Sequence, residues 1–256
     1  MKEPGQFSVT ALRGLPMFAA GMDVAAEIAV AADGLADGDI VVIAQKIVSK
    51  AEGRTVALAE VQPGKEARTM AAGTARPPEM AQLILDESAA ILRATPAAVI
   101  ARHRTGHVLA NAGIDASNVA GGDAGTVLLW PVDPDASARA IRAGLRARTG
   151  ARVGVVIADS MGRAWRIGTV GSAIGCAGLQ VLEDRRGKAQ DLFGRTLQAT
   201  VIAVADAVAA MAVLAMGEGA EGTPAAVVRG CGHWVSEDDG PGAAAGLRPL
   251  AEDMFR

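Results

Sequence analysis

The segment ARVGVVIADS (151–160) constrains the fold most strongly, because it is a run of small and β-branched apolar residues that ends in an acidic residue. A short, continuous apolar run of this kind is typical of a buried β-strand. A strand that ends in a carboxylate delivers that group to the edge of its sheet, where open sheets often bind ligands. Asp159 is therefore a candidate site residue, and Ser160 beside it supplies a second oxygen.

Other segments alternate between strand patterns and helix patterns. We expect strands in the segments 6–12, 39–50 (which runs into a polar exit), 95–103, 106–113, 125–130 and 223–230. We expect helices in the segments 22–35, 77–94, 133–150 and 199–217. This alternation indicates an α/β or α+β enzyme-like layout rather than a helical bundle or a β-sandwich, and spacing alone leaves the choice between the two open.

Composition sets limits on the core and on the partners. Half of the 256 residues are hydrophobic but only 3% are aromatic and none is Tyr, so the core must consist of Ala, Val, Leu and Ile. The formal net charge is −3, without a basic stripe interleaved with aromatic residues, which argues against nucleic acid as the main partner.

The cellular setting that the sequence predicts is the cytoplasm. The two cysteines, Cys176 and Cys231, cannot form a disulfide framework and fit a reducing compartment. The N-terminal residues MKEPGQFSV lack the apolar stretch of a signal peptide. The most apolar segment, 199–217, carries Asp206 in its middle, so we interpret it as a buried helix rather than a membrane span.

The stretch VLANAGIDASNVAGG (108–122) places a second carboxylate, Asp115, behind a short apolar run and among small polar residues and glycines. Two carboxylates with hydroxyl or carbonyl oxygens beside them would form a site suited to Mg²⁺ or Mn²⁺. The alternative is that Asp115 and Asp159 each only cap a turn or a helix. His103, His107 and His233 do not follow a zinc pattern, because a turn is expected between the first two.

The segment GEGAEG (217–222) matches the glycine pattern of dinucleotide-binding loops. It follows a helix and precedes a strand, which is the reverse of the required order, and this excludes a Rossmann site. The sequence also lacks a P-loop motif. A glycine-rich turn can still bring backbone amides close to phosphate, and Glu218 within it can reach a metal.

Two further groups of cations are candidates for ligand binding. Lys46, Lys50 and Arg54 follow a strand and can hold phosphate oxygens, the alternative being a solvated loop. The segment SMGRAWRIG adds Arg163, Trp165 and Arg166, which suit a flat anionic ligand through stacking and bidentate contacts. The alternative for Trp165 is a place in the core.

Taken together, these segments resemble the coenzyme F420-0:L-glutamate ligase family of γ-glutamyl ligases. The resemblance spans nearly the whole chain, and IVSKAEGR combined with NAGIDASN is highly specific. The matching segments are RGLP (13–16), DGDIVVIAQKIVSKAEGR (37–54), GHVLANAGIDASN (106–118), VLLWPVDPDASARAIR (127–142), DSMGRAWRIGTVGSAIGCAGL (159–179), DLFGRTLQAT (191–200) and MGEGAEGTPAAVVRG (216–230).

The resemblance implies GTP-dependent formation of an amide between L-glutamate and the carboxylate of coenzyme F420-0 through an acyl phosphate, followed by further γ-linked glutamate. It also implies Mg²⁺ or Mn²⁺, two ions in all, with K⁺ as a monovalent activator, and a homodimer. The implied fold is a two-part α+β structure with mixed sheets flanked by helices, distinct from P-loop, Rossmann and ATP-grasp folds. We expect one lobe from residues 1–70 and 195–248, an inserted lobe from 71–194, and a tail at 249–256.

The resemblance also implies roles for individual residues. Asp115 and Asp159 would bind one divalent ion, Ser160 (where the family usually has Thr) would contribute to a second, and Glu218 lies near this site where relatives place Gln or another polar residue. The nucleotide contacts would be Leu15, Pro16, Met17, Phe18, Gln45, Lys50, Asn118, Met216, Gly217, Glu218, Gly219, Ala220, Glu221, Gly222 and Thr223. The deazaflavin substrate would meet Arg163, Trp165 and Arg166, in a loop where Met161 and Ala164 depart from the commoner Phe and Pro.

Two other functions compete with the ligase. The same two aspartates would serve a metal-dependent phosphohydrolase acting on a nucleotide or an acyl phosphate, with water in place of the amine. A non-catalytic nucleotide-binding subunit is disfavoured by the presence of Asp115, Asp159 and Lys50 together.

Overall fold

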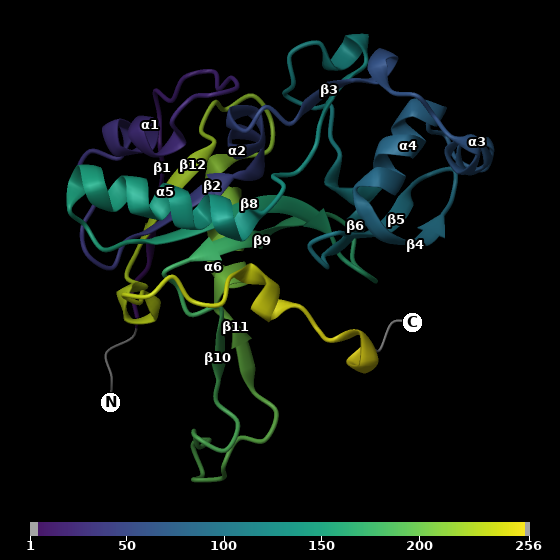
Figure 1. Ribbon diagram of the computed structural model, residues 1–256. Coiled ribbons are helices and arrows are strands. Elements are labelled where there is room, and N and C mark those ends of the chain that lie inside the picture. Colours follow the sequence, from purple (N-terminus) through teal and green to yellow (C-terminus); the bar gives the residue numbers. More distant parts are fainter. Residues whose placement is uncertain (1–4, 254–256) are drawn as a thin grey trace.

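A computed structural model describes residues 5–253 and is built around a five-stranded mixed sheet (Figure 1). The strand order is β1-β12-β2-β8-β9, in which β2 and β8 run parallel and all other neighbours are antiparallel. The strands are β1 (Ser8–Ala11), β2 (Ile40–Ala44), β8 (Gly154–Gly162), β9 (Thr169–Ala177) and β12 (Ala225–Arg229). The first four residues, and residues 254–256 of the predicted tail, lie outside the described residues.

Helices cover both faces of this sheet, which explains why its central strands are apolar without alternation. Successive residues of β2 belong to different cores: Val41 and Ile43 pack with α1 (Val24–Ala31) and α5 (Pro134–Thr149). Ile40 and Val42 pack on the other face with α6 (Val204–Met216). No helix within residues 5–253 is long and apolar enough to cross a membrane, and the apolar segment around Asp206 forms the buried helix α6, as predicted.

A second group of elements lies to the right of the central sheet in Figure 1 and has a small core of its own. In this core, Leu83 and Ile84 of α4 pack against Val99 and Ala101 of β5. The helices of this group are α3 (Lys65–Ala72) and α4 (Pro78–Asp86). Its strands are β3 (Thr55–Ala57) paired with β7 (Thr126–Leu128), and the sheet of β4 (Ser88–Ala94), β5 (Val99–His103) and β6 (Val108–Ala110).

The hairpin of β10 (Leu182–Asp184) and β11 (Val201–Ala203) projects away from the body of the molecule, at the bottom of Figure 1. Its connecting loop carries Leu192 and Phe193, which are 100% and 83% exposed. Large apolar side chains in this position are candidates for contact with another surface.

The α+β class is confirmed, and so are most of the predicted elements. Some segments differ from the prediction. The predicted helix 199–217 begins only at Val204, because Val201–Ala203 form strand β11, and the predicted strand 106–113 is shortened to Val108–Ala110. The predicted strand 39–50 ends at Ala44, and α2 (Gln45–Ala51) begins at once, so Lys46 and Lys50 lie on a helix and not in a solvated loop. The predicted helix 77–94 ends at Asp86, because the next residues form β4 and pair with β5.

The central sheet also crosses the predicted lobe boundaries. Strands β8 and β9 lie within the 71–194 segment that was assigned to the inserted lobe, yet β8 pairs directly with β2. The predicted division into lobes stays a prediction. The sheet pairing favours an inserted segment that begins near Thr55 and ends near Leu128, where β3 and β7 pair with each other.

The core consists mainly of Ala, Val, Leu and Ile, as the composition predicts, with one large exception. Trp130 is fully buried between the central sheet and the second group of elements. The two cysteines are buried and unpaired, and burial raises the pKa of Cys176 to about 12.

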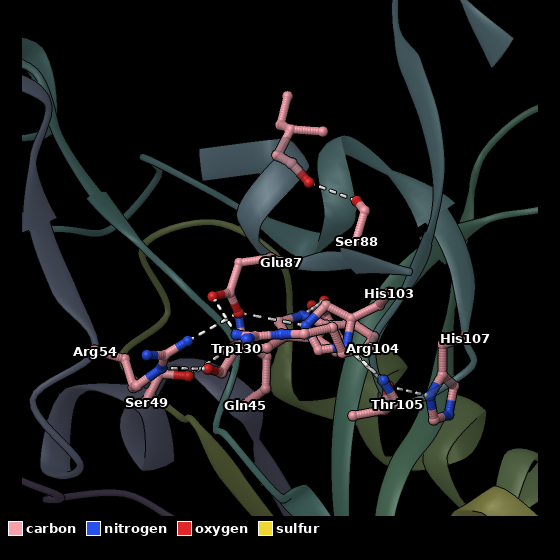
Figure 2. Close-up of polar contacts among 12 residues, drawn as sticks. Gln45, Ser49, Arg54, Glu87, Ser88, His103, Arg104, Thr105, His107 and Trp130 are labelled. Atoms are coloured by element: carbon pink, nitrogen blue, oxygen red, sulfur yellow. Dashed lines mark hydrogen bonds and ion pairs between the residues drawn. The ribbon is translucent and has the colours of Figure 1, made fainter. Parts of the chain in front are cut away.

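A buried carboxylate, Glu87, joins the two groups of elements at the end of α4 (Figure 2). Arg54, which follows α2, donates to its Oε2 at 2.8 Å, and Arg104 donates to its Oε1 at 2.6 Å. The ring of His103 lies 3.5 Å from Oε2. Burial opposes ionisation of Glu87, but the nearby His103 ring and the two guanidinium groups outweigh it and bring the pKa to about 2.

We predict that Glu87→Gln lowers the free energy of unfolding by about 3 kcal/mol at pH 7, because a depressed carboxyl pKa stabilises the folded state wherever that carboxyl is ionised. The pKa is lower in the folded protein than the ordinary value of 4.5, so the contribution is complete above pH 4.5 and disappears as the pH falls toward 2. Urea unfolding of both proteins across this range checks the prediction. The exposed neighbour Asp86 provides the control, since Asp86→Asn should change stability by less than about 0.5 kcal/mol. A difference between wild type and Glu87→Gln that does not shrink below pH 4.5 would contradict the assignment.

Candidate functional site

A pocket of about 570 Å³ opens at one end of the central sheet. Five segments that are distant in sequence surround it: the N-terminal loop, the β2–α2 junction, the loop 118–120, the end of β8, and the loop that follows α6. It is lined by Leu15, Pro16, Met17, Phe18, Ala44, Gln45, Lys46, Ile47, Lys50, Asn118, Val119, Ala120, Ala158, Asp159, Ser160, Val213, residues 216–223 and Pro224.

The parallel pairing of β2 and β8 explains why these residues meet. Ala44 and Ala158 are register partners. Strand β2 ends at Ala44, whereas β8 runs on in the same direction through Asp159 and Ser160, paired with β9. Gln45 and Lys46 therefore lie close to Asp159 and Ser160. The carboxyl ends of adjacent parallel strands are the usual ligand-binding position in open sheets.

Asp115 lies beside this edge in a loop from the second group of elements. Lys46 Nζ is 2.7 Å from its Oδ2, and the Ser117 hydroxyl donates to the same oxygen at 2.9 Å. The backbone N–H of Ser117 donates to Oδ1 at 2.7 Å. Burial opposes ionisation, but these donors and the ammonium charge keep the pKa of Asp115 below its usual value. Asp115 thus caps a turn and also pairs with Lys46, whose side chain lines the pocket.

Asp159 is more deeply enclosed and is held by neutral donors. The indole Nε1 of Trp130 donates to Oδ2 at 2.8 Å, and the backbone N–H of Ser160 donates to Oδ1 at 2.9 Å. Burial raises the pKa of Asp159 to about 6, although the two hydrogen bonds and the charge of Lys46 act in the opposite direction. The negative charge of Asp115 adds to the rise, which places the two carboxylates within electrostatic reach of each other.

The two lysines of α2 point toward the loop that carries Asp115. Lys46 donates to the hydroxyl of Ser117 at 2.5 Å, and Lys50 donates to the carbonyl of Asn118 at 2.7 Å. Burial and the neighbouring charge of Lys46 lower the pKa of Lys50. Arg54, the third cation of the predicted group, is elsewhere: it donates to the Trp130 carbonyl and to Glu87.

Gln45 offers an unused donor to the pocket. Its side chain is buried, and its Oε1 accepts a hydrogen bond from Ser49 at 2.8 Å. Its Nε2 has no hydrogen-bond partner among the described residues. A buried amide that lacks a partner is costly, so a ligand acceptor at this point would stabilise the site.

The glycine-rich loop after α6 closes the pocket. Gly217 has φ +81°, and a Cβ at this position would lie 2.4 Å from the Glu221 side chain, so only glycine fits. Glu221 Oε2 accepts from the N–H of Gly219 at 2.8 Å, and Asn118 donates to the Gly219 carbonyl at 3.1 Å. As the sequence predicted, this loop follows a helix and precedes a strand.

The comparisons with known proteins identify the family. The family model described as F420-0:Gamma-glutamyl ligase matches residues 14–230. A coenzyme F420:L-glutamate ligase of Methanothermobacter thermautotrophicus is 44% identical over 253 residues, covering 97% of this chain and 98% of the relative. Proteins with the same name from Methanopyrus kandleri and Methanocaldococcus jannaschii are 44% and 40% identical, covering 92% and 100% of this chain and 92% and 99% of the relatives.

The chain belongs to the F420-0:γ-glutamyl ligase family. The range matched by the family model includes every residue that lines the pocket, from Leu15 to Pro224. The pocket is therefore built wholly from the part of the chain that defines these ligases.

The oxygen atoms at the sheet edge fit a divalent cation. Asp115, Asp159 and Ser160 offer two carboxylates and one hydroxyl, which is the hard-oxygen chemistry that Mg²⁺ and Mn²⁺ prefer. Within residues 5–253 no group of three or more His, Cys, Asp or Glu side chains is placed to hold a metal ion by itself. Magnesium usually binds through one or two carboxylates and substrate phosphates, so this set suits a site that the nucleotide completes. Glu218 lies on the rim of the same pocket.

The predicted substrate-binding residues lie outside the lining of the pocket. Arg163, Trp165 and Arg166 occupy the loop between β8 and β9, which begins three residues after Ser160. All three side chains are exposed, and Trp165 is 89% exposed, so a place for Trp165 in the core is wrong. An exposed loop that carries an aromatic ring and two guanidinium groups remains available to a ligand.

Sequence reasoning assigned no role to Trp130, although it contacts Asp159 directly. The only local signal was its place at the end of the strand-like run GTVLLW. Two histidines enclose its indole, with ring centroids 5.0 Å (His103) and 5.6 Å (His107) away. These histidines are buried on the two sides of the β5–β6 turn.

Proposed function

We propose that this protein joins L-glutamate to the carboxylate of coenzyme F420-0, with GTP as the activating co-substrate, in coenzyme F420 biosynthesis. Membership of the γ-glutamyl ligase family and the names of its relatives support the ligase reaction. The observation that carries the proposal is the meeting of two carboxylates and two lysines, Asp115, Asp159, Lys46 and Lys50, at one edge of a pocket with the volume of a nucleotide site.

The chemistry explains why a nucleotide is needed. An amine does not displace oxide from a carboxylate at neutral pH, so the acid must first be activated. In the proposed reaction a carboxylate oxygen of F420-0 attacks the γ-phosphorus of GTP, which gives an acyl phosphate and GDP. The amine of L-glutamate then attacks the acyl carbon, loses a proton, and displaces phosphate to leave the amide.

The lysines would hold the phosphates of GTP. Lys46 and Lys50 lie on the first two turns of α2, and their ammonium groups converge on the loop 115–118. The unpaired amide of Gln45 and the apolar side chains of residues 15–18 would contact the rest of the nucleotide. Asn118 and the loop 216–223 would complete the nucleotide site, with backbone amides of the glycine-rich loop near phosphate.

The carboxylates would hold the divalent metal. Asp115 and Asp159 would bind one Mg²⁺ or Mn²⁺, Ser160 would contribute to a second, and Glu218 would lie close to both. Such ions neutralise the charge of the transferred phosphoryl group. We extend the proposal to K⁺ as a monovalent activator, in line with the family resemblance.

The remaining parts of the proposal concern the acceptor and the assembly. Arg163, Trp165 and Arg166 would bind the flat ring and phosphodiester of the deazaflavin substrate, and further γ-linked glutamate would be added at the same site. We propose a homodimer, supported by the exposed Leu192 and Phe193 of the β10–β11 hairpin. Two buried, unbridged cysteines fit a reducing cytoplasm.

The direct test is to incubate the protein with GTP, Mn²⁺, F420-0 and L-glutamate, and to measure the product by mass. We predict a product heavier by one glutamyl residue or more, and we predict that Asp159→Asn abolishes it while the protein stays folded, because the change removes charge but keeps shape. Asp123→Asn, which alters an exposed carboxylate near the same loop, is the control and should retain activity. Phosphate release that does not depend on glutamate would support a phosphohydrolase instead, and near-normal activity of Asp159→Asn at low Mn²⁺ would remove Asp159 from the metal site.

A second prediction concerns the nucleotide. Lys50→Met keeps the apolar stem and removes the charge, so the affinity for a non-hydrolysable GTP analogue should fall by about 10- to 100-fold, the usual effect of losing a charged hydrogen bond. Calorimetry measures this directly. Lys65→Met, at the exposed start of α3, is the matched control and should bind normally. Unchanged nucleotide affinity combined with a raised KM for glutamate would show that Lys50 contacts the glutamate substrate and not GTP.

A third prediction concerns the β8–β9 loop. Arg166→Ala should raise the KM for F420-0 by about tenfold or more and leave GTP affinity nearly unchanged, because the lost contact would be made only to the acceptor. Separate titrations of the two ligands give the answer. Arg93→Ala, another exposed arginine on β4, serves as the control. Equal loss of both affinities, or of neither, would exclude the loop from the acceptor site.

A further inference from the structure

We infer that Trp130 is a positioning residue for Asp159, and that the second group of elements (residues 55–128) holds the indole in place. The inference rests on the proposed function, because it assumes that the Asp159 carboxylate takes part in the reaction. Trp130 itself does not line the pocket, so it would act only through Asp159.

The first step of the argument is that Asp159 has one fixed side-chain partner. Its Oδ1 accepts from the adjacent Ser160 N–H, and its Oδ2 accepts from Trp130 Nε1 at 2.8 Å. Lys46, the nearest cation, is paired with Asp115 instead. The indole is therefore the only side chain within residues 5–253 that donates a hydrogen bond to Asp159. With one lone pair of each oxygen used, the remaining lone pairs face a defined direction.

The second step is that the indole cannot turn. Trp130 is fully buried, with His103 and His107 against its ring at interplanar angles of 52° and 78° (Figure 2). A Cβ on Gly113 would lie 2.4 Å from Trp130 Nε1, so glycine at this position is what makes room for the ring. Gly113 belongs to the same short segment that carries Asp115.

The third step is that ion pairs and hydrogen bonds hold the elements that surround the Trp130 ring. Arg54 donates to the Trp130 carbonyl at 2.8 Å and to Glu87 at 2.8 Å, which connects the residue after α2 to the end of α4. Thr105 lies between the two histidines, with its hydroxyl 2.9 Å from Nδ1 of each ring. Figure 2 shows these side chains converging on Trp130.

As a consequence, Asp159 accepts a hydrogen bond from a neutral donor, the Trp130 indole, at a position where a cation would cancel the charge of the carboxylate. A neutral N–H orients the Asp159 carboxylate without cancelling its charge, so the carboxylate keeps its attraction for a divalent ion. Partners that orient ligating groups in this way typically change metal affinity or turnover by about 10- to 100-fold when they are removed. Loss of the indole N–H would leave Asp159 free to rotate about its side-chain bonds.

The test is Trp130→Phe, which keeps an aromatic ring in the core and removes only the donor. We expect Mn²⁺ affinity, measured from the electron paramagnetic resonance signal of free Mn²⁺, and kcat each to fall by about 10- to 100-fold. The affinity for a non-hydrolysable GTP analogue in the absence of metal should stay within about twofold, because no nucleotide-binding residue changes. Trp234→Phe is the matched control: it removes an indole that donates to Glu183 at 2.9 Å, away from the pocket, and should change neither quantity.

A measurement on the unaltered ring covers the case in which Trp130→Phe does not fold. The protein has three tryptophans, so Trp165→Phe and Trp234→Phe assign the Trp130 indole N–H signal by elimination in a nitrogen–proton correlation spectrum. Mg²⁺ should shift this signal, and the shift should disappear in Asp159→Asn. Normal Mn²⁺ affinity and kcat in Trp130→Phe, or an indole signal that Mg²⁺ does not move, would overturn the inference. An active Asp159→Asn would instead remove Asp159 from the proposed metal site and leave the ligase reaction standing.

Discussion

The parallel pairing of β2 with β8 is the constraint on which the site depends. Among the described residues these are the only two neighbours in the central sheet that run in the same direction, so their carboxyl ends point to the same edge. One of them continues into α2 with its two lysines, and the other continues with Asp159 and Ser160. If the same two strands were antiparallel, their carboxyl ends would lie at opposite edges of the sheet, and the lysines of α2 would be separated from Asp159 by the length of a strand.

The segment between the two strands brings Asp115 and Asn118 to that edge, whereas residues 15–18 and 216–223 reach the pocket from outside this segment. The second group of elements delivers Asp115 to Lys46 and packs its histidines against Trp130. Glu87 stabilises the packing of the second group of elements against the central sheet. A buried carboxylate between two guanidinium groups is favourable only when the carboxylate and both guanidinium groups stay in position. The charges that face the ligand and the charges that fix the elements thus form two separate sets, joined by Trp130 and Arg54.

The sequence predicted the features that depend on neighbouring residues. The apolar run before Asp159 predicted a buried strand, and the proline and glycine that bound α5 predicted its ends. The helix predicted over 77–94 failed beyond Asp86, because β5 competes for those residues and a pairing partner is invisible in local periodicity. The family resemblance placed Asp115 and Asp159 in one site, and this assignment stays a prediction; the charge of Lys46 acts on both carboxylates. Contacts such as Lys46 with Ser117, 71 residues apart, and Trp130 with Asp159 arise only from the tertiary fold, so composition and spacing gave no sign of them.

The close approach of Gly113 to Trp130 also constrains how these two positions can evolve. A side chain larger than hydrogen at position 113 would occupy the space of the indole nitrogen, so it becomes sterically possible only after residue 130 has become smaller. The backbone at Gly113, with φ +77°, adds a separate penalty that a smaller partner does not relieve. Glycine at position 113 is thus required while Trp130 is present and stays favoured after residue 130 has become smaller, so among descendants of this sequence position 113 should change more rarely than position 130.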